Sequence, residues 1–178
     1  FFYLYSFTDV LVRLPESLSS TSQPGDWAMF RHDLLHSGST GDAGIVPKGE
    51  HKWSFATGDV IHSSPAISNG IVYVGSRNGR LYALDADTGD LVWQFQTGSW
   101  IAPHPAIANG VVYFGSNDGY LYALNADTGE QLWAFDAVYA VRSSPAVAGD
   151  KVYFGADDSN VDALNTETGE KAWSFETD

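Results

Sequence analysis

The 178-residue sequence contains 44% apolar and 14% aromatic residues, which is enough apolar material for a folded core. Twenty-two acidic residues stand against nine basic ones, and the formal net charge of -13 makes nucleic acid and anionic membrane surfaces poor partners. The absence of cysteine excludes disulfides, thiol catalysis and cysteine-ligated metals.

Residues 1–26 are interpreted as a poorly ordered N-terminal segment and linker. The apolar run 1–14 carries Asp9 and Arg13 and has no basic leader, so it is a poor signal peptide, and it is too short to span a membrane. Residues 15–26 are rich in Ser and Pro, which is typical of a flexible linker. We therefore predict no membrane insertion.

Residues 27–52 are interpreted as a segment that leads into a repeat domain at 53–178. His32 and His36 in this segment stand four residues apart, a spacing that could hold a metal on one helical face. The same pair fits hydrogen-bonded histidines in a short segment, and no third ligand is evident. We predict no metal site.

A repeat of 40 residues dominates the rest of the chain. Four tryptophans occur at this interval, and each begins a Trp-x-Phe pattern: Trp53, Trp93, Trp133 and Trp173. The segments between them align without a gap, and we place the repeats at about 57–96, 97–136 and 137–176. A fixed period of this length indicates one supersecondary unit per repeat.

Turn residues divide each repeat into four short strands. In the first repeat, strands are expected after Pro65, at 71–75, at 81–84 and at 91–95. The first hairpin is expected to use a type I′ turn at Asn69-Gly70, and its counterparts are Asn109-Gly110 and Gly149-Asp150. The second turn is expected at Asn78-Gly79, at Asp118-Gly119 and at Ser159-Asn160.

The predicted fold is an all-β propeller of four-stranded antiparallel blades, with three blades plus a closing strand around Trp53. A single four-stranded meander has too small a core, so neighbouring units must stack on one another. Because propellers usually have roughly four to eight blades, we expect the chain to be a fragment, or copies of it to associate into a ring.

The segment 83–93 (ALDADTGDLVW) resembles the tryptophan-docking motif A-x-[DN]-x-x-T-G-x-x-x-W of pyrroloquinoline-quinone (PQQ)-like, quinoprotein-type propellers. Residues 123–133 and 163–173 keep every specified position, and residues 26–33 resemble the segment before the first blade in such proteins. The resemblance implies a structural role for the four tryptophans, which pack between blades, and for the Thr-Gly turns that support them. The glycines of these turns are Gly89, Gly129 and Gly169.

Positions that depart from the repeat frame are the candidate ligand-binding residues, because loop positions that do not serve stacking can serve binding. They fall in loops expected near the central channel and on one face. The set is His62, Arg77, Trp100, His104, Asp118, Tyr139 and Arg142. Neutral variation of surface residues explains these departures equally well.

Enzyme chemistry is not indicated by the residues. Asp85, Asp87 and Asp90 resemble the opening of a calcium loop, but the bidentate Glu that ends such a loop is missing, and a plain turn accounts for them. No nucleophile elbow accompanies any Ser, His and Asp combination, so we predict no catalytic residue.

The predicted function is a non-catalytic binding or scaffold module, extracytoplasmic at the periplasm or cell surface, as the resemblance implies. Its partner would be a protein, a polymer or the missing blades of the same protein, and no cofactor is evident. The alternative is a fragment of a PQQ-dependent alcohol or sugar dehydrogenase, with PQQ and calcium. The acidic surface is typical of a halophilic protein or of an ordinary acidic secreted domain.

Overall fold

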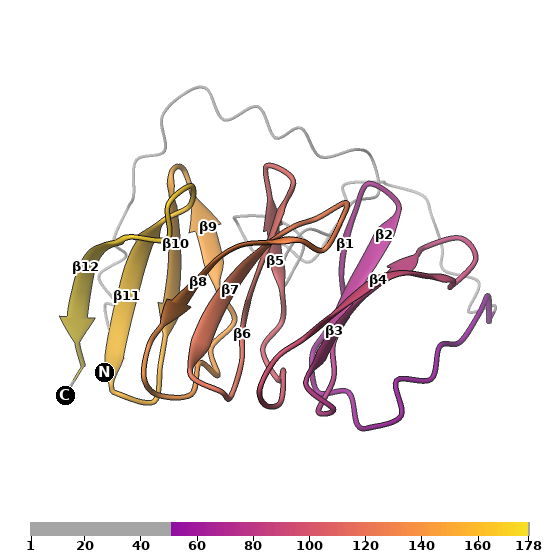
Figure 1. Cartoon of the computed structure of the whole chain (residues 1–178), viewed down its shortest axis with the longest axis horizontal. Helices are drawn as coiled ribbons and strands as arrows, with labels where there is room; N and C mark the ends of the chain where they lie inside the picture. The colour runs from indigo at the N-terminus through magenta and orange to yellow at the C-terminus, as the bar shows by residue number, and fades with distance from the viewer. Residues whose placement is uncertain (1–50, 178) are drawn as a thin grey trace, which may run out of the picture.

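The computed structural model describes residues 51–177 and arranges them as three four-stranded antiparallel sheets (Figure 1). The first sheet holds β1 (Ala66–Ser68), β2 (Ile71–Gly75), β3 (Arg80–Asp85) and β4 (Leu91–Gln96). The second holds β5 (Ala106–Ala108), β6 (Val111–Gly115), β7 (Tyr120–Asn125) and β8 (Gln131–Asp136). The third holds β9 (Ala146–Ala148), β10 (Lys151–Gly155), β11 (Asn160–Asn165) and β12 (Lys171–Glu176).

These three sheets are the predicted blades, so the all-β propeller class is confirmed. Within residues 51–177 there is no helix, and hence none able to cross a membrane. The predicted linker at 1–26, almost all of the segment at 27–52, and the pair His32 and His36 lie outside the described residues.

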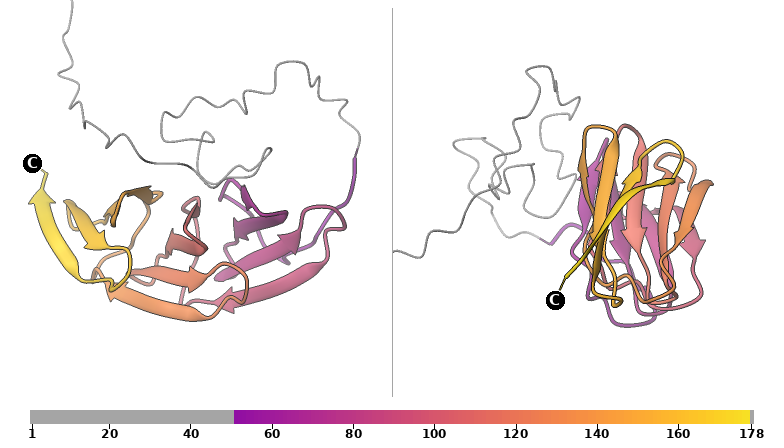
Figure 2. Two further views of the ribbon diagram at one scale, coloured as in Figure 1. Left: turned by 90° about the horizontal axis from the view of Figure 1, so that it is seen from above. Right: turned by 90° about the vertical axis from the view of Figure 1, so that its left-hand side faces the viewer.

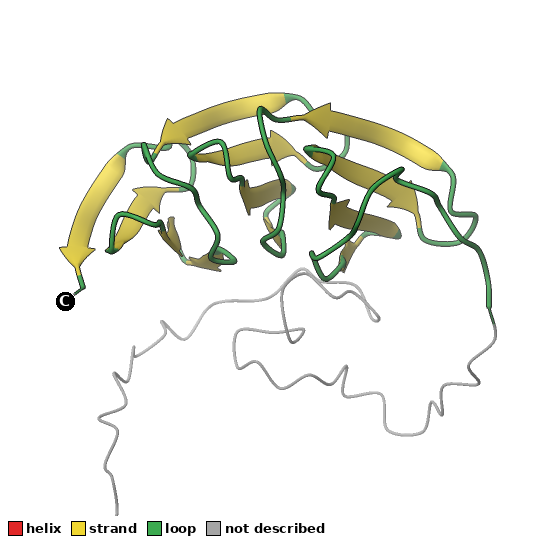
Figure 3. Cartoon of the chain, turned by 90° about the horizontal axis from the view of Figure 1, so that it is seen from below, coloured by secondary structure: helices red, strands yellow, loops and turns green. Residues whose placement is uncertain are grey.

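The sheets stand side by side in an arc (Figure 2). The long strands β4, β8 and β12 lie on its outer, convex side, and the three-residue strands β1, β5 and β9 lie toward the inner, concave side (Figure 3). Each sheet follows the chain order, so the strands of a blade form a simple meander with consecutive neighbours paired.

The first hairpin of blades 1 and 2 has the predicted turn. Asn69 and Gly70 have φ of 50° and 73°, and Ser68 pairs with Ile71 across a two-residue loop, as a type I′ turn requires. The third blade departs from this expectation, because Gly149 (φ 61°) is the one residue of its pair with a positive φ. Glycine at the first turn position is the pattern of a type II′ turn.

The second turn of blade 3 was predicted one residue too late. Ser159 has a φ of 65° and occupies the place of Gly79 (φ 80°) and Gly119 (φ 95°), while Asn160 already begins β11. The turn is therefore Asp158-Ser159. The missing glycine hid the alignment, because a serine in the left-handed region is uncommon.

Stacked blade faces form the core. Tyr73 and Leu81 of blade 1 pack in one buried cluster with Val112, Phe114 and Leu124 of blade 2. All five side chains are almost completely buried. A second cluster repeats this arrangement between blades 2 and 3.

Three of the four tryptophans recur in one setting, each docked on the blade that follows it in the chain. The Trp93 indole N–H donates to the Ala126 carbonyl at 2.9 Å, across 33 residues and into the next blade. Trp53 and Trp133 donate in the same way to the carbonyls of Ala86 and Thr166 at 3.0 Å each. Trp173 lies on β12, at the end of the third blade.

The segment at Trp53 is not the closing strand that we expected. Residues 53–56 have no strand assignment, although Trp53 lies in its dock on blade 1 and Phe55 packs at the same face. A strand needs a hydrogen-bonded neighbour, and the described residues offer none at this edge.

Candidate functional site

One face of the arc is built from two kinds of connection that lie side by side. The loops 57–65, 97–105 and 137–145 lead into the inner strands, and the β2–β3, β6–β7 and β10–β11 turns lie beside them. Backbone hydrogen bonds join each loop to the turn of the blade that it enters, as from the Asn117 N–H to the Trp100 carbonyl at 2.9 Å. We call this surface the loop face.

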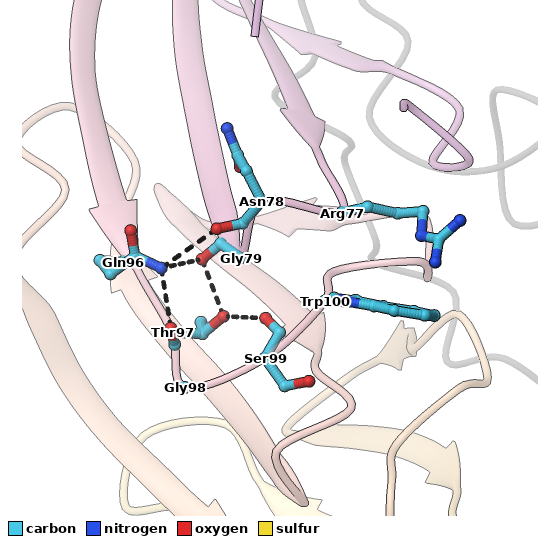
Figure 4. Close-up of a pocket in the computed structure, with 8 residues that line it drawn as sticks. All are labelled: Arg77, Asn78, Gly79, Gln96, Thr97, Gly98, Ser99 and Trp100. Carbon is cyan, nitrogen blue, oxygen red and sulfur yellow. Dashed lines mark hydrogen bonds between the residues drawn. The ribbon is translucent and has the colours of Figure 1, made fainter. Parts of the chain in front are cut away.

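Arg77 and Trp100 meet on the loop face across the junction of blades 1 and 2. The Arg77 guanidinium carbon lies 3.7 Å from the centroid of the Trp100 ring (Figure 4). Such a cation–π contact contributes about 0.5–1 kcal/mol at an exposed site, so it favours this orientation of the ring. Trp100 remains 46% exposed. The contact therefore presents an aromatic surface in a defined orientation.

A hollow of about 260 Å³ lies beside this pair (Figure 4). The Gln96 side-chain amide donates to the carbonyls of Gly79 at 3.1 Å and Thr97 at 2.8 Å. The Thr97 hydroxyl lies 2.8 Å from the Gly79 carbonyl oxygen and 2.7 Å from that of Ser99. These polar groups already have protein partners, so the Trp100 ring is the distinctive feature of the hollow.

Asp118 holds the turn of blade 2 in place. Its carboxylate accepts hydrogen bonds from the Gly98 N–H at 2.7 Å and from the Tyr122 hydroxyl at 2.9 Å. Burial, followed by this carboxylate, raises the pKa of Tyr122. The side chain that the sequence offered as a ligand thus connects a loop, a turn and a strand.

His104 links three successive blades near the inner strands. Its Nδ1 accepts the Ser64 backbone N–H, and its own backbone N–H donates to the Ser144 hydroxyl at 3.0 Å. Burial lowers the pKa of His104. A backbone N–H can only donate, so Nδ1 must accept this hydrogen bond. The neutral ring with an unprotonated Nδ1 is therefore the form that makes the link.

The remaining candidates are exposed and are not gathered at one point. Arg142 makes an ion pair with Asp157, at 3.2 Å between Nη1 and Oδ2. His62 is exposed, and Tyr139 is 55% exposed. The structure therefore joins Arg77 to Trp100 but does not assemble all seven candidates into one pocket.

Sequence reasoning missed Val138. Its φ is 67°, and the Tyr139 N–H donates to the Ala137 carbonyl at 2.7 Å, which closes a three-residue turn around it. A β-branched residue at positive φ is a genuine outlier, and such strain clusters at functional sites. The available signal was Gly58, which holds the same place in the repeat with a φ of 84°.

The exposed apolar side chains of the loop face form a discontinuous strip along the blades. They are Val60, Trp100, Val138 and Tyr139. Aromatic and apolar groups of this kind, set among polar loops, are typical of the centre of a protein-binding surface. The loop face therefore offers apolar and aromatic contacts to a partner.

Comparisons with known proteins agree on the fold. The family model described as outer membrane protein assembly factor BamB matches residues 42–178. A search of the curated proteins returns no match. Among solved structures, BamB from Moraxella catarrhalis is 27% identical with a TM-score of 0.63, and the alignment covers 70% of this chain and 39% of that one.

Two dehydrogenases share the fold at lower identity. A europium-containing methanol dehydrogenase is 24% identical with a TM-score of 0.73, and the alignment covers 85% of this chain and 32% of that one. The quinohemoprotein alcohol dehydrogenase ADHIIG from Pseudomonas putida HK5 has the same identity and TM-score, with coverages of 87% and 27%. The chain thus spans 39% or less of each of these three structures.

Proposed function

The chain belongs to the BamB-like family of PQQ-type propellers, and we propose that it is a non-catalytic docking module whose loop face binds a protein or polymer partner. The observation that carries the proposal is the oriented, half-exposed ring of Trp100 beneath Arg77. Tryptophan and arginine dominate the energetics of protein interfaces, and an ordered side chain loses less entropy on binding.

The polar atoms of the other candidate residues bond to the chain itself, which supports a docking role. Asp118 and His104 are engaged in bonds between loops and blades, and Arg142 is paired with Asp157. Their contacts make the loop face rigid, while the apolar strip stays open to solvent. A rigid support below an exposed aromatic group is the arrangement that a docking surface needs.

We further propose an extracytoplasmic location. The matched family is named for outer membrane protein assembly, and one similar solved structure is a BamB. The missing blades of a longer protein are a second kind of partner, which would cover the ends of the arc and leave the loop face free.

The alternative proposal, part of a PQQ-dependent alcohol or sugar dehydrogenase, draws support from the fold likeness to two dehydrogenases. Residues 51–177 bring no three His, Cys, Asp or Glu side chains together.

The test is retention of a partner from extracts of the source organism by the immobilised full chain. We expect Trp100→Ala to reduce retention of one reproducible partner by about tenfold or more, and Arg77→Ala to reduce it less. Leu132→Ala is the matched control, because Leu132 is half-exposed on the outer strand β8, away from the loop face. Equal retention by Trp100→Ala and the wild type would contradict the proposal. Saturable binding of PQQ with calcium in a fluorescence titration would favour the dehydrogenase.

A further inference from the structure

Arg77 differs from the other lysines and arginines that the structure describes, because no oxygen atom of the chain binds its charge. Among residues 51–177, its guanidinium contacts the Trp100 ring but no hydrogen-bond acceptor. Every other Lys and Arg of this range has an oxygen partner, and the pairs are Lys52 with Asp87, Arg80 with Gln96, Arg142 with Asp157, Lys151 with Asp150, and Lys171 with Asp162. In this acidic chain, the N–H donors of Arg77 are therefore available to a ligand.

Two further donors belong to residues that line the same hollow as Arg77 (Figure 4). They are the indole N–H of Trp100 and the hydroxyl of Ser99, and neither has a hydrogen-bond partner within the described part of the chain. Asp59, in the loop that bonds to the Arg77 backbone, accepts the Val60 N–H at 2.7 Å and makes no ion pair with Arg77. The hollow thus combines an unpaired cation, free donors and an exposed ring, which favours an anionic group with acceptor oxygens.

A partner that binds on the Trp100 ring must also cover Arg77, because the two side chains are in contact. This step rests on the docking role proposed above. Arg77 is already half-buried, and covering its charge without an acceptor would leave an unpaired cation at the interface, which weakens binding strongly. A carboxylate removes this penalty, and its two oxygens match the guanidinium fork.

The surroundings of Arg77 favour a single carboxylate over a series of them. The same face carries the exposed apolar side chains of Val138 and Tyr139, which suit the side chains of a protein. An acidic polysaccharide repeats its charge along the polymer, so the net charge of -13 on this chain repels it. A protein segment can instead place one carboxylate among apolar side chains.

We propose that the partner of the loop face is a protein segment that places one Asp or Glu carboxylate on Arg77 and apolar side chains on Trp100. The junction of these two residues lies between two blades that the structure describes. The carboxylate determines which segment binds, because charge complementarity contributes more to specificity than to affinity. The Trp100 ring supplies the larger share of the affinity.

The experiment is a titration of the isotope-labelled full chain, followed by the NMR signal of the Trp100 indole N–H. Comparison with Trp100→Phe assigns this signal. The probes are acetyl-Leu-Glu-Leu-amide and acetyl-Leu-Gln-Leu-amide, which differ by one charge. We expect the Glu peptide to bind the wild type about tenfold more tightly than the Gln peptide, and Arg77→Gln to abolish this preference. Arg142→Gln is the matched control, because it removes one positive charge from the same face and should keep the preference.

Equal binding of the two peptides by the wild type would overturn the proposal, and so would loss of the preference in Arg142→Gln. Tighter binding of trigalacturonate at the Trp100 signal would also overturn it, because the partner would then be an acidic sugar polymer.

Partner retention separates this proposal from the docking role itself. If the Glu preference is absent while Trp100→Ala still loses its partner, the docking role stands and the carboxylate is wrong. If the preference is present and depends on Arg77, while Trp100→Ala retains the partner fully, the carboxylate site stands and the docking role is wrong.

Discussion

The indole ring of Trp93 lies against the bare backbone of Gly129 in the next blade, and a Cβ at Gly129 would fall 2.7 Å from the ring. Two features require glycine at this position: the close approach of the ring and a left-handed φ of 72°. Trp53 meets Gly89 in this way, and Trp133 meets Gly169. The Thr-Gly turn and the tryptophan of the repeat therefore form a single joint between blades.

Gly129→Ala should be among the most destabilising single methyl additions in the chain. Left-handed backbone strain costs about 1–2 kcal/mol, and overpacking against the Trp93 ring adds about 1–3 kcal/mol. The matched control is Gly110→Ala, whose φ is 74° but whose Cβ would have nothing within 4 Å. Urea denaturation measures both free energies of unfolding. Equal losses in the two variants would show that the ring contact contributes nothing.

Asp162 is a buried carboxylate at a position where the other two blades have tyrosine. It is 2% exposed, and the Lys171 ammonium lies 3.0 Å from its Oδ1. The geometry of this ion pair is not that of a directed hydrogen bond, because the same oxygen has no hydrogen-bond partner. In blade 2 the equivalent Tyr122 stacks on Phe114 at 5.3 Å between ring centroids.

Removing the lysine alone should therefore destabilise blade 3. Lys171→Gln, which copies Gln131 of blade 2, leaves the carboxylate buried without its cation, at a cost of about 1–3 kcal/mol given the partial exposure of Lys171. Asp162→Tyr with Lys171→Gln should recover that loss or exceed the wild-type stability, because an aromatic pair replaces the ion pair. Thermal unfolding checks both variants. If Lys171→Gln unfolds at the same temperature as the wild type, the Asp162 carboxylate is solvated.

His104 should make stability depend on pH. Burial holds its pKa in the folded chain below the unfolded value of 6.5, so the unfolded state binds more protons between the two values. The full contribution is present above the unfolded pKa, and the free energy of unfolding falls as pH decreases through that value. It levels off below the folded pKa.

Urea denaturation of the full chain at neutral and at mildly acidic pH tests this dependence. His104→Ser, which copies Ser64 and Ser144, should flatten the slope just below neutrality. His62→Ser is the control, because His62 is exposed and should leave the slope in place. If the free energy of unfolding depends on pH equally in His104→Ser and in the wild type, His104 is not the source of that dependence.

Periodicity predicted the features that every blade repeats, such as the strand order and the setting of Trp93. It predicted less where one blade differs from the others. Arg77 and Trp100 stand 23 residues apart in different connections, and the stacking of two blades brings them together. Asp118 was chosen as a loop variant, but its bond to Tyr122 depends on a side-chain direction that spacing does not give. The third-blade turn was misplaced because Ser159 stands where the pattern requires glycine.

Substitution of Val138 can separate an effect on stability from an effect on partner binding. Its φ of 67° strains a β-branched backbone, whereas Gly58 holds the equivalent position at 84°. Val138→Gly should therefore raise the free energy of unfolding by about 1 kcal/mol, since the left-handed penalty disappears and only part of it returns as lost entropy.

The same substitution removes a side chain that is 76% exposed on the loop face, so partner retention should fall as stability rises. Val138→Ala is the matched control, because it shortens the side chain but keeps the left-handed strain. Urea denaturation and partner retention, measured on the same preparations, decide the matter. If Val138→Gly gains stability and binds fully, the strained turn has no part in docking. If Val138→Gly is no more stable than Val138→Ala, the backbone at this turn carries no strain for glycine to relieve.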